Sequence, residues 1–138
     1  MTETTVLKIV EKIFKKNLHG HQKKALSEIA LGAIRNNGGR LTDMARGMSP
    51  STSVKHRVKR VIRFLGNENI LIEEKAPVFL KFLLPWLGSV ERPVIFMDWS
   101  EEHDQNVLML SLKYKKRSIP FYWVTIKNGH LIRSRNST

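Results

Sequence analysis

The chain has 138 residues, and its 24 Lys and Arg residues against 12 Asp and Glu residues give a formal net charge of +12. This length provides one ordinary domain or two small ones and excludes a large enzyme. Cysteine is absent, which excludes disulfides and thiolate metal sites, and the apolar stretches are shorter than the ~20 residues of a membrane-spanning helix.

The distribution of charge indicates a polyanionic partner. Two basic regions flank an acidic region that covers residues 64–104. Strongly basic small proteins are typical binders of nucleic acid or of anionic membrane surfaces. Because the N-terminus carries no apolar run like that of a signal peptide, we expect a soluble cytoplasmic protein, associated with the nucleoid and without a membrane partner.

Five helical segments are predicted before any strand. Apolar residues recur at three- and four-residue spacing over 6–14, 26–34 and 79–87, which is the period of an amphipathic helix. The stretches "NLHGH" and "NNGG" are expected to end the first two helices. The segment "LTDMARGM" is long enough for two helical turns, and a further helix is predicted over about 51–65, between several serines that can cap it and Gly66.

The predicted helix over 51–65 has an apolar side and a basic side. At about 100° per residue, five apolar residues share one side: Val54, Val58, Val61, Ile62 and Leu65. Five basic residues spread over the other side: Lys55, Arg57, Lys59, Arg60 and Arg63. Together with the preceding short helix and the "GMSP" turn, this pattern resembles a helix-turn-helix, whose second helix enters the major groove of DNA. The alternative is a solvated amphipathic helix that contacts no nucleic acid.

From residue 94 onward the sequence changes to the pattern of strands. Polar turns separate three β-branched and aromatic runs, which are "VIFMDW", "NVLMLSLKY" and "IPFYWVTI". The first turn is expected to contain Glu101, Glu102 and Asp104. The first run is apolar on both faces and is predicted to lie inside a sheet. Pro120 cannot donate to a strand ladder, so the third run is predicted to be an edge. The predicted fold is α+β: an N-terminal helical bundle with a helix-turn-helix-like unit, followed by a three-stranded antiparallel β-meander.

Asp98 ends the most hydrophobic of these runs and is a candidate functional residue. The segment "VIFMDWSEEHDQNVLMLSLKYKKRSIPFYW", 94–123, resembles the first three strands of the catalytic domain in DDE transposases of bacterial insertion sequences, whose fold is ribonuclease H-like. The segment "KHRVKRVIRFLGNENI", 55–70, resembles the part that precedes this domain in the same family. The resemblance implies a helical DNA-binding region over 1–88 and an incomplete ribonuclease H-like domain over 89–138.

The resemblance also implies that Asp98 is the first of the family's three metal-binding carboxylates, and therefore both a catalytic residue and a metal ligand. The complete enzyme would use Mg²⁺ or Mn²⁺ to cut and join phosphodiester bonds, since carboxylates suit hard divalent cations. The alternative is a turn aspartate that bonds its own backbone. The family's second carboxylate lies on a fourth strand and its third on a later helix, and residue 138 precedes both. We therefore expect the chain alone to hold no metal tightly and neither to cut nor to join DNA.

A second basic cluster lies in the predicted turn between the second and third strands. Two interpretations of this cluster have equal weight: it binds the DNA backbone, or it is a solvated turn. The cluster contains Lys115, Lys116 and Arg117, with Lys113 beside them. The expected function is that of a transposase fragment that retains DNA binding. Its partners would be the terminal inverted repeats of an element, and a second copy or a full-length transposase. The alternative is a small basic DNA-binding regulator without catalytic activity.

Overall fold

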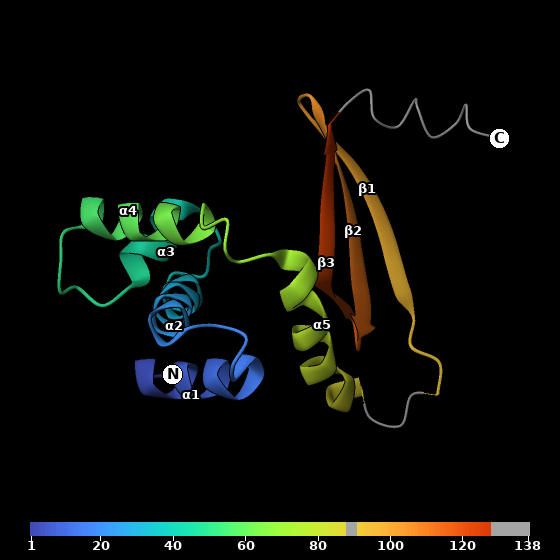
Figure 1. Ribbon diagram of the computed structural model, residues 1–138, viewed down its shortest axis with the longest axis horizontal. Helices are drawn as coiled ribbons and strands as arrows, with labels where there is room; N and C mark the ends of the chain where they lie inside the picture. The colour runs from blue at the N-terminus through green and yellow to red at the C-terminus, as the bar shows by residue number, and fades with distance from the viewer. Residues whose placement is uncertain (88–90, 128–138) are drawn as a thin grey trace. The chain divides into compact units, whose positions relative to one another are not determined.

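The computed structural model describes residues 1–87 and 91–127, and it divides the chain into two compact units (Figure 1). Five α-helices precede a three-stranded antiparallel sheet, so the predicted α+β class is confirmed. The units divide between Leu71 and Ile72, whereas the sequence predicts a boundary after residue 88. The reason is that the fifth helix packs its apolar side on the sheet and so belongs to the second unit. No helix in the described ranges is long and apolar enough to cross a membrane.

The first unit is built from four helices, which are α1 (Glu3–Phe14), α2 (Gly20–Arg35), α3 (Leu41–Gly47) and α4 (Val54–Leu65). Side chains cap two of them in the way that short polar residues commonly do. The Thr2 hydroxyl accepts the Thr5 amide at 3.3 Å, and the Ser53 hydroxyl accepts the His56 amide at 3.4 Å. Because Ser53 is the cap, α4 begins at Val54 rather than near residue 51.

Two small apolar clusters hold the first unit together. One joins α1 to α2 through Val6, Val10 and Leu31. The other joins α2, α3 and α4 and centres on four buried residues: Ile29, Ala45, Met48 and Val61. Since α3 and α4 both contact α2, this second cluster positions the helix-turn-helix-like pair on one supporting helix.

The crossing of α2 and α3 depends on two glycines that face each other. A methyl group added at Gly32 would overlap the carbonyl oxygen of Met44, and one added at Gly47 would overlap the carbonyl oxygen of Gly32. The obstructing atoms belong to the backbone and cannot rotate away as a flexible side chain can. Glycine at both positions therefore permits a helix-to-helix approach that any side chain would prevent.

The second unit places a helix against a sheet. Its elements are α5 (Ile72–Leu83), the short 3₁₀ helix η1 (Leu84–Leu87), β1 (Ile95–Glu102), β2 (Gln105–Tyr114) and β3 (Arg117–Lys127). The three strands lie side by side in the order β1-β2-β3 (Figure 1). The apolar side of α5 packs on one face of the sheet through a cluster of Leu83, Leu112 and Phe121. This cluster covers β2 and β3 and includes no residue of β1.

The strand connections are shorter than the predicted polar turns. Glu102 pairs with Gln105 and Tyr114 with Arg117, so each hairpin turns through two residues, and Glu101 and Glu102 lie in β1 instead of in the turn. The first turn residues, His103 and Lys115, have φ values of 55° and 54°. A positive φ at this position matches the two-residue turns that suit the right-handed twist of paired strands.

The edges of the sheet agree with one prediction and overturn another. β3 lies at one end of the strand order, as Pro120 predicts, and the pairing shifts register between Leu110 and Ser111 opposite that proline. The prediction that the first apolar run lies inside the sheet is wrong for the described residues, in which β1 pairs with β2 alone. An apolar pattern on both faces indicates burial, and the described part of the chain supplies no strand for the second flank.

Candidate nucleic-acid interface

The exposed side of α4 carries a stripe of three cations. Lys55, Lys59 and Arg63 are exposed and lie four residues apart, so they follow one line along the helix. His56 is exposed beside them, and α4 contains no acidic residue. Neighbouring positive charges repel one another, and a polyanion that lies across them reduces this repulsion. We call these three residues the α4 stripe.

Arg57 does not belong to the exposed basic side that its position in the sequence predicts. Its side chain is buried, with 7% of the residue exposed, and Nη1 donates to the carbonyl oxygens of Met48 at 2.8 Å and Arg46 at 3.3 Å. These carbonyls lie at the C-terminal end of α3 and in the connection that follows it. Arg57 thus satisfies acceptors that the end of α3 leaves unpaired, and it fixes the turn between α3 and α4.

We expect Arg57→Leu to lower the stability of the first unit, because Arg57 is buried inside this unit and not exposed on α4. The substitution leaves the carbonyls of Arg46 and Met48 without their donor, which typically costs about 1–3 kcal/mol. Thermal unfolding followed by circular dichroism would measure the loss. Lys55→Leu, at an exposed position of the same helix, should stay within about 0.5 kcal/mol of the wild type. Equal effects of the two substitutions would contradict the structural role of Arg57.

The packed side of α4 is rotated from the one that the apolar pattern predicts. Val61 is fully buried and Val58 and Phe64 pack against the same cluster, whereas Val54, Ile62 and Leu65 are 39%, 51% and 60% exposed. The buried side therefore includes Arg57, and three of the five residues on the predicted apolar side lie outside it. As a consequence, Ile62 lies on the solvent side next to the α4 stripe.

Arg60 lies at the border of the stripe and forms an ion pair with Glu28 of α2. The Glu28 side chain is only 10% exposed, against 40% for Arg60, so the pair ties α2 to α4 at the surface of the unit. Because this carboxylate already balances its charge, Arg60 offers an external anion less than the exposed Arg63 does.

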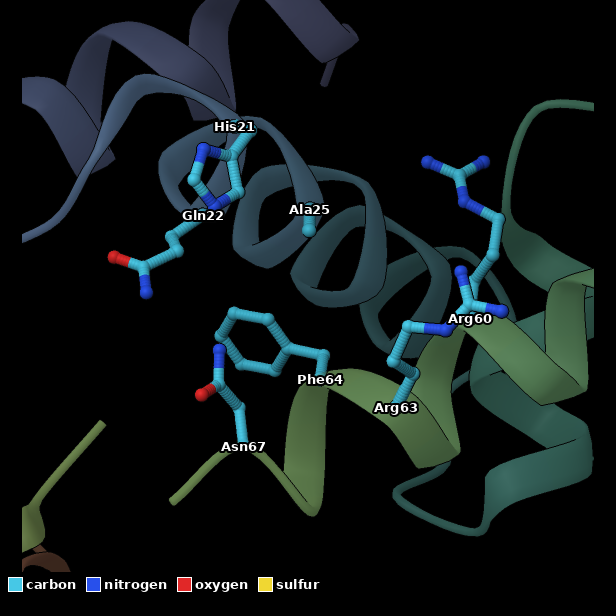
Figure 2. Close-up of a pocket in the computed structure, with 7 residues that line it drawn as sticks. All are labelled: His21, Gln22, Ala25, Arg60, Arg63, Phe64 and Asn67. Atoms are coloured by element: carbon cyan, nitrogen blue, oxygen red, sulfur yellow. The ribbon is translucent and has the colours of Figure 1, made fainter. Parts of the chain in front are cut away.

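A pocket of about 160 Å³ adjoins this ion pair, between α2 and α4 (Figure 2). His21 and Gln22 line it from α2, and Arg60, Arg63 and Phe64 line it from α4. The sequence draws attention to His21 only through the "HGH" motif, and nothing in the pattern predicts that it lines the same pocket as Arg63. The pocket lies between the basic residues Arg60 and Arg63 of α4 and the beginning of α2.

The predicted basic cluster of the second unit forms around the β2–β3 turn. A pocket of about 330 Å³ is lined by Phe96 of β1, by Ser118 and by the four cations that the sequence places here: Lys113, Lys115, Lys116 and Arg117. The Lys115 ammonium lies 5.4 Å from the centroid of the Tyr114 ring, a cation–π distance. Phe96 is the residue that sequence reasoning missed, and strand register could have found it, since Phe96 pairs with Ser111, two residues from Lys113.

Asp98 is exposed on β1, opposite Met109 of β2 and on the face of the sheet away from α5. Side chains alternate between the two faces of a strand, so Glu101, an odd number of positions after Asp98, points to the opposite face. In residues 1–87 and 91–127 no group of three or more His, Cys, Asp or Glu side chains is placed to hold a metal ion. A two-metal site needs several carboxylates around one point, so the described residues do not fit a metal pair at Asp98.

No protein-family model matches the sequence, and no curated protein or solved structure matches it either.

Proposed function

We propose that this chain binds duplex DNA through α4 and that it is part of a DNA transposase whose complete form cuts and joins element ends. The observation that carries the DNA-binding role is the α4 stripe, three exposed cations in line on the second helix of a helix-turn-helix-like pair. The assignment to DDE transposases is supported by the resemblance of residues 55–70 and 94–123.

In this proposal α4 lies in the major groove and α3 braces it. Helix-turn-helix proteins use the N-terminal part of the second helix to contact base edges, which assigns base contacts to the end of α4 that carries Lys55 and His56. Lys59 and Arg63 lie further along the same side and would contact phosphates, which set the position and orientation of the protein. Arg57 positions α4 from behind and is removed from the set of proposed DNA contacts.

The test is the salt dependence of DNA binding, measured by fluorescence anisotropy with a labelled duplex. Each phosphate that the protein neutralises lowers the slope of log affinity against log salt by about 0.9. Three contacts from the α4 stripe therefore predict a slope of about −2.7 or steeper. A slope near zero would mean that the basic side is only a solvated surface.

No cleavage is expected from this chain by itself. With Mg²⁺ or Mn²⁺ and a duplex that carries element ends, the purified protein should neither nick nor transfer strands, because the described residues bring no group of three or more His, Cys, Asp or Glu side chains together to hold a metal pair. A supercoiled-plasmid nicking assay and a strand-transfer assay would check this. Metal-dependent activity that Asp98→Asn abolishes would show that the chain assembles a metal site after all.

The second candidate function is a small DNA-binding regulator, which would need no metal-binding group of the kind that the described residues lack. Mobility-shift assays separate the two proposals. A transposase part should prefer terminal inverted repeats over random duplex of equal length. A regulator should instead prefer its own operator, and it should bind element ends no better than random DNA.

A further inference from the structure

The strand β1 presents an exposed apolar edge. Four of its residues are large and apolar, yet each is at least 41% exposed: Ile95, Phe96, Met97 and Trp99. Met97, the third residue of the strand, is 72% exposed. The cluster beneath α5 does not extend to β1. No strand within residues 1–87 and 91–127 pairs with this edge, and a regular apolar edge of this kind is a strong template for another strand.

The backbone of β1 indicates which residues face this free edge. The Lys113 amide donates to the Val94 carbonyl at 2.9 Å, so position 94 directs its polar backbone groups toward β2. In an antiparallel pair this direction alternates along the strand. Positions 96, 98 and 100 therefore also bond to β2, whereas Ile95, Met97 and Trp99 direct their amides and carbonyls outward.

We propose that β1 pairs with β1 of a second copy of this chain, antiparallel, about a two-fold axis at Met97. In this register Met97 lies opposite its own counterpart, and Ile95 lies opposite Trp99 of the second copy. All of these residues direct backbone groups outward, so each pair forms regular ladder hydrogen bonds. The result is one continuous sheet of six strands, with an isologous interface.

Side-chain chemistry also favours this register. Ile95, Met97 and Trp99 lie on the α5 side of β1, and the two-fold axis brings the residues of both copies together in one apolar cluster. Asp98 comes opposite Phe96 of the second copy, so its carboxylate faces no like charge across the pair. The backbone allows two neighbouring registers. The one centred on Asp98 pairs this residue with itself, in the closely spaced type of pair that like charges destabilise, and the one centred on Phe96 leaves Trp99 without an apolar partner on the second β1.

Cysteine cross-linking tests the register directly, because the chain contains no cysteine. Directly opposite residues of a hydrogen-bonded pair have Cα atoms about 5.5 Å apart, which a disulfide can span. The full-length Met97→Cys variant treated with diamide should therefore form a covalent dimer on non-reducing gels. Ile95→Cys alone should not, since the two copies of position 95 lie roughly 13 Å apart along the strands. A mixture of Ile95→Cys and Trp99→Cys should cross-link.

A backbone variant tests the edge without adding a thiol. Met97→Pro removes one outward amide and no hydrogen bond to β2, so the fold should persist while the dimer is lost. Met97→Ile keeps the amide and an apolar side chain and is the matched control. Sedimentation equilibrium should give a dimer for the wild type and for Met97→Ile, and a monomer for Met97→Pro, with unchanged far-ultraviolet circular dichroism.

Three results would overturn the proposal: a monomeric wild type, a dimeric Met97→Pro variant, or cross-linking of Ile95→Cys alone as efficient as that of Met97→Cys. A monomer would leave the edge for a strand from another protein or from a longer chain. These outcomes are distinct from a failure of DNA binding, because the α4 stripe lies in the other unit of the chain.

Discussion

Replacing Lys55, Lys59 and Arg63 together by glutamine is expected to remove most of the DNA affinity of this chain. The three exposed cations of the α4 stripe would each release about 0.9 counterion equivalents from the duplex, so the slope of log affinity against log salt should become shallower by about 2.7. Near 0.1 M salt this corresponds to a loss of roughly 10²–10³-fold in affinity. The fold should be unaffected, because none of the three side chains is buried.

The matched control carries the same change in net charge at another surface. Lys8, Lys12 and Lys24 are exposed on α1 and α2, and their joint replacement by glutamine lowers the charge equally. Titrations of both triple variants against a labelled duplex at several salt concentrations would compare the slopes. Equal reductions would show that the protein binds DNA through its net charge, and α4 would then lose its special role.

Gly32→Ala is expected to destabilise the first unit, although alanine in a helix interior usually stabilises. In an ordinary helix this change contributes about 0.5–1 kcal/mol in favour of folding. Here the added methyl group overlaps the Met44 carbonyl of α3, and α2 and α3 must separate. Overpacking of this kind costs about 1–3 kcal/mol, which in a unit of this size lowers the melting temperature by roughly 10 °C. Gly47→Ala should behave alike, because its methyl group overlaps the backbone of Gly32.

The control for this prediction lies in the same helix. A methyl group at Gly20, the first residue of α2, meets no atom within 4 Å, so Gly20→Ala should be neutral or slightly stabilising. Differential scanning calorimetry of the three variants would measure the changes. A melting temperature of Gly32→Ala equal to or above the wild-type value would show that the two helices are not in backbone contact.

Because α4 depends on the α2–α3 crossing for its position, stability and DNA affinity are connected in this unit. Separation of α2 from α3 would disturb the cluster of Ile29, Ala45, Met48 and Val61 that supports α4. Gly32→Ala should therefore weaken DNA binding indirectly. The salt slope distinguishes the two causes, since loss of the folded fraction lowers affinity while the slope of the remaining folded protein stays the same.

Local patterns in the sequence predict most of the secondary structure. Apolar spacing locates the helices, and β-branched and aromatic runs locate the strands, because these preferences act over a few residues. The edge position of β3 is also predictable, since Pro120 has no amide to donate. The hairpin turns are predicted less well, because two-residue turns include His103 and Lys115, whose positive φ values are uncommon for residues other than glycine.

The candidate interface is predictable only in part. Composition and helical period identify a basic side on α4, and Lys55, Lys59 and Arg63 are exposed on it as expected. They do not identify Arg57 as a buried residue, because a helical period leaves the rotation of the helix open by a residue or two. The carbonyls at the end of α3 decide that rotation by giving Arg57 acceptors inside the unit.

The sequence by itself determines which segments become helices and strands, that the chain is strongly basic, and which helix collects the cations, since each of these follows from neighbouring residues. Only the tertiary structure decides that Arg57 turns inward, that Gly32 meets Gly47, and that β1 lies at an edge of the described sheet. These three features depend on atoms far apart in the chain. Packing, backbone contact and strand order bring those atoms together, and a short-range pattern contains none of that information.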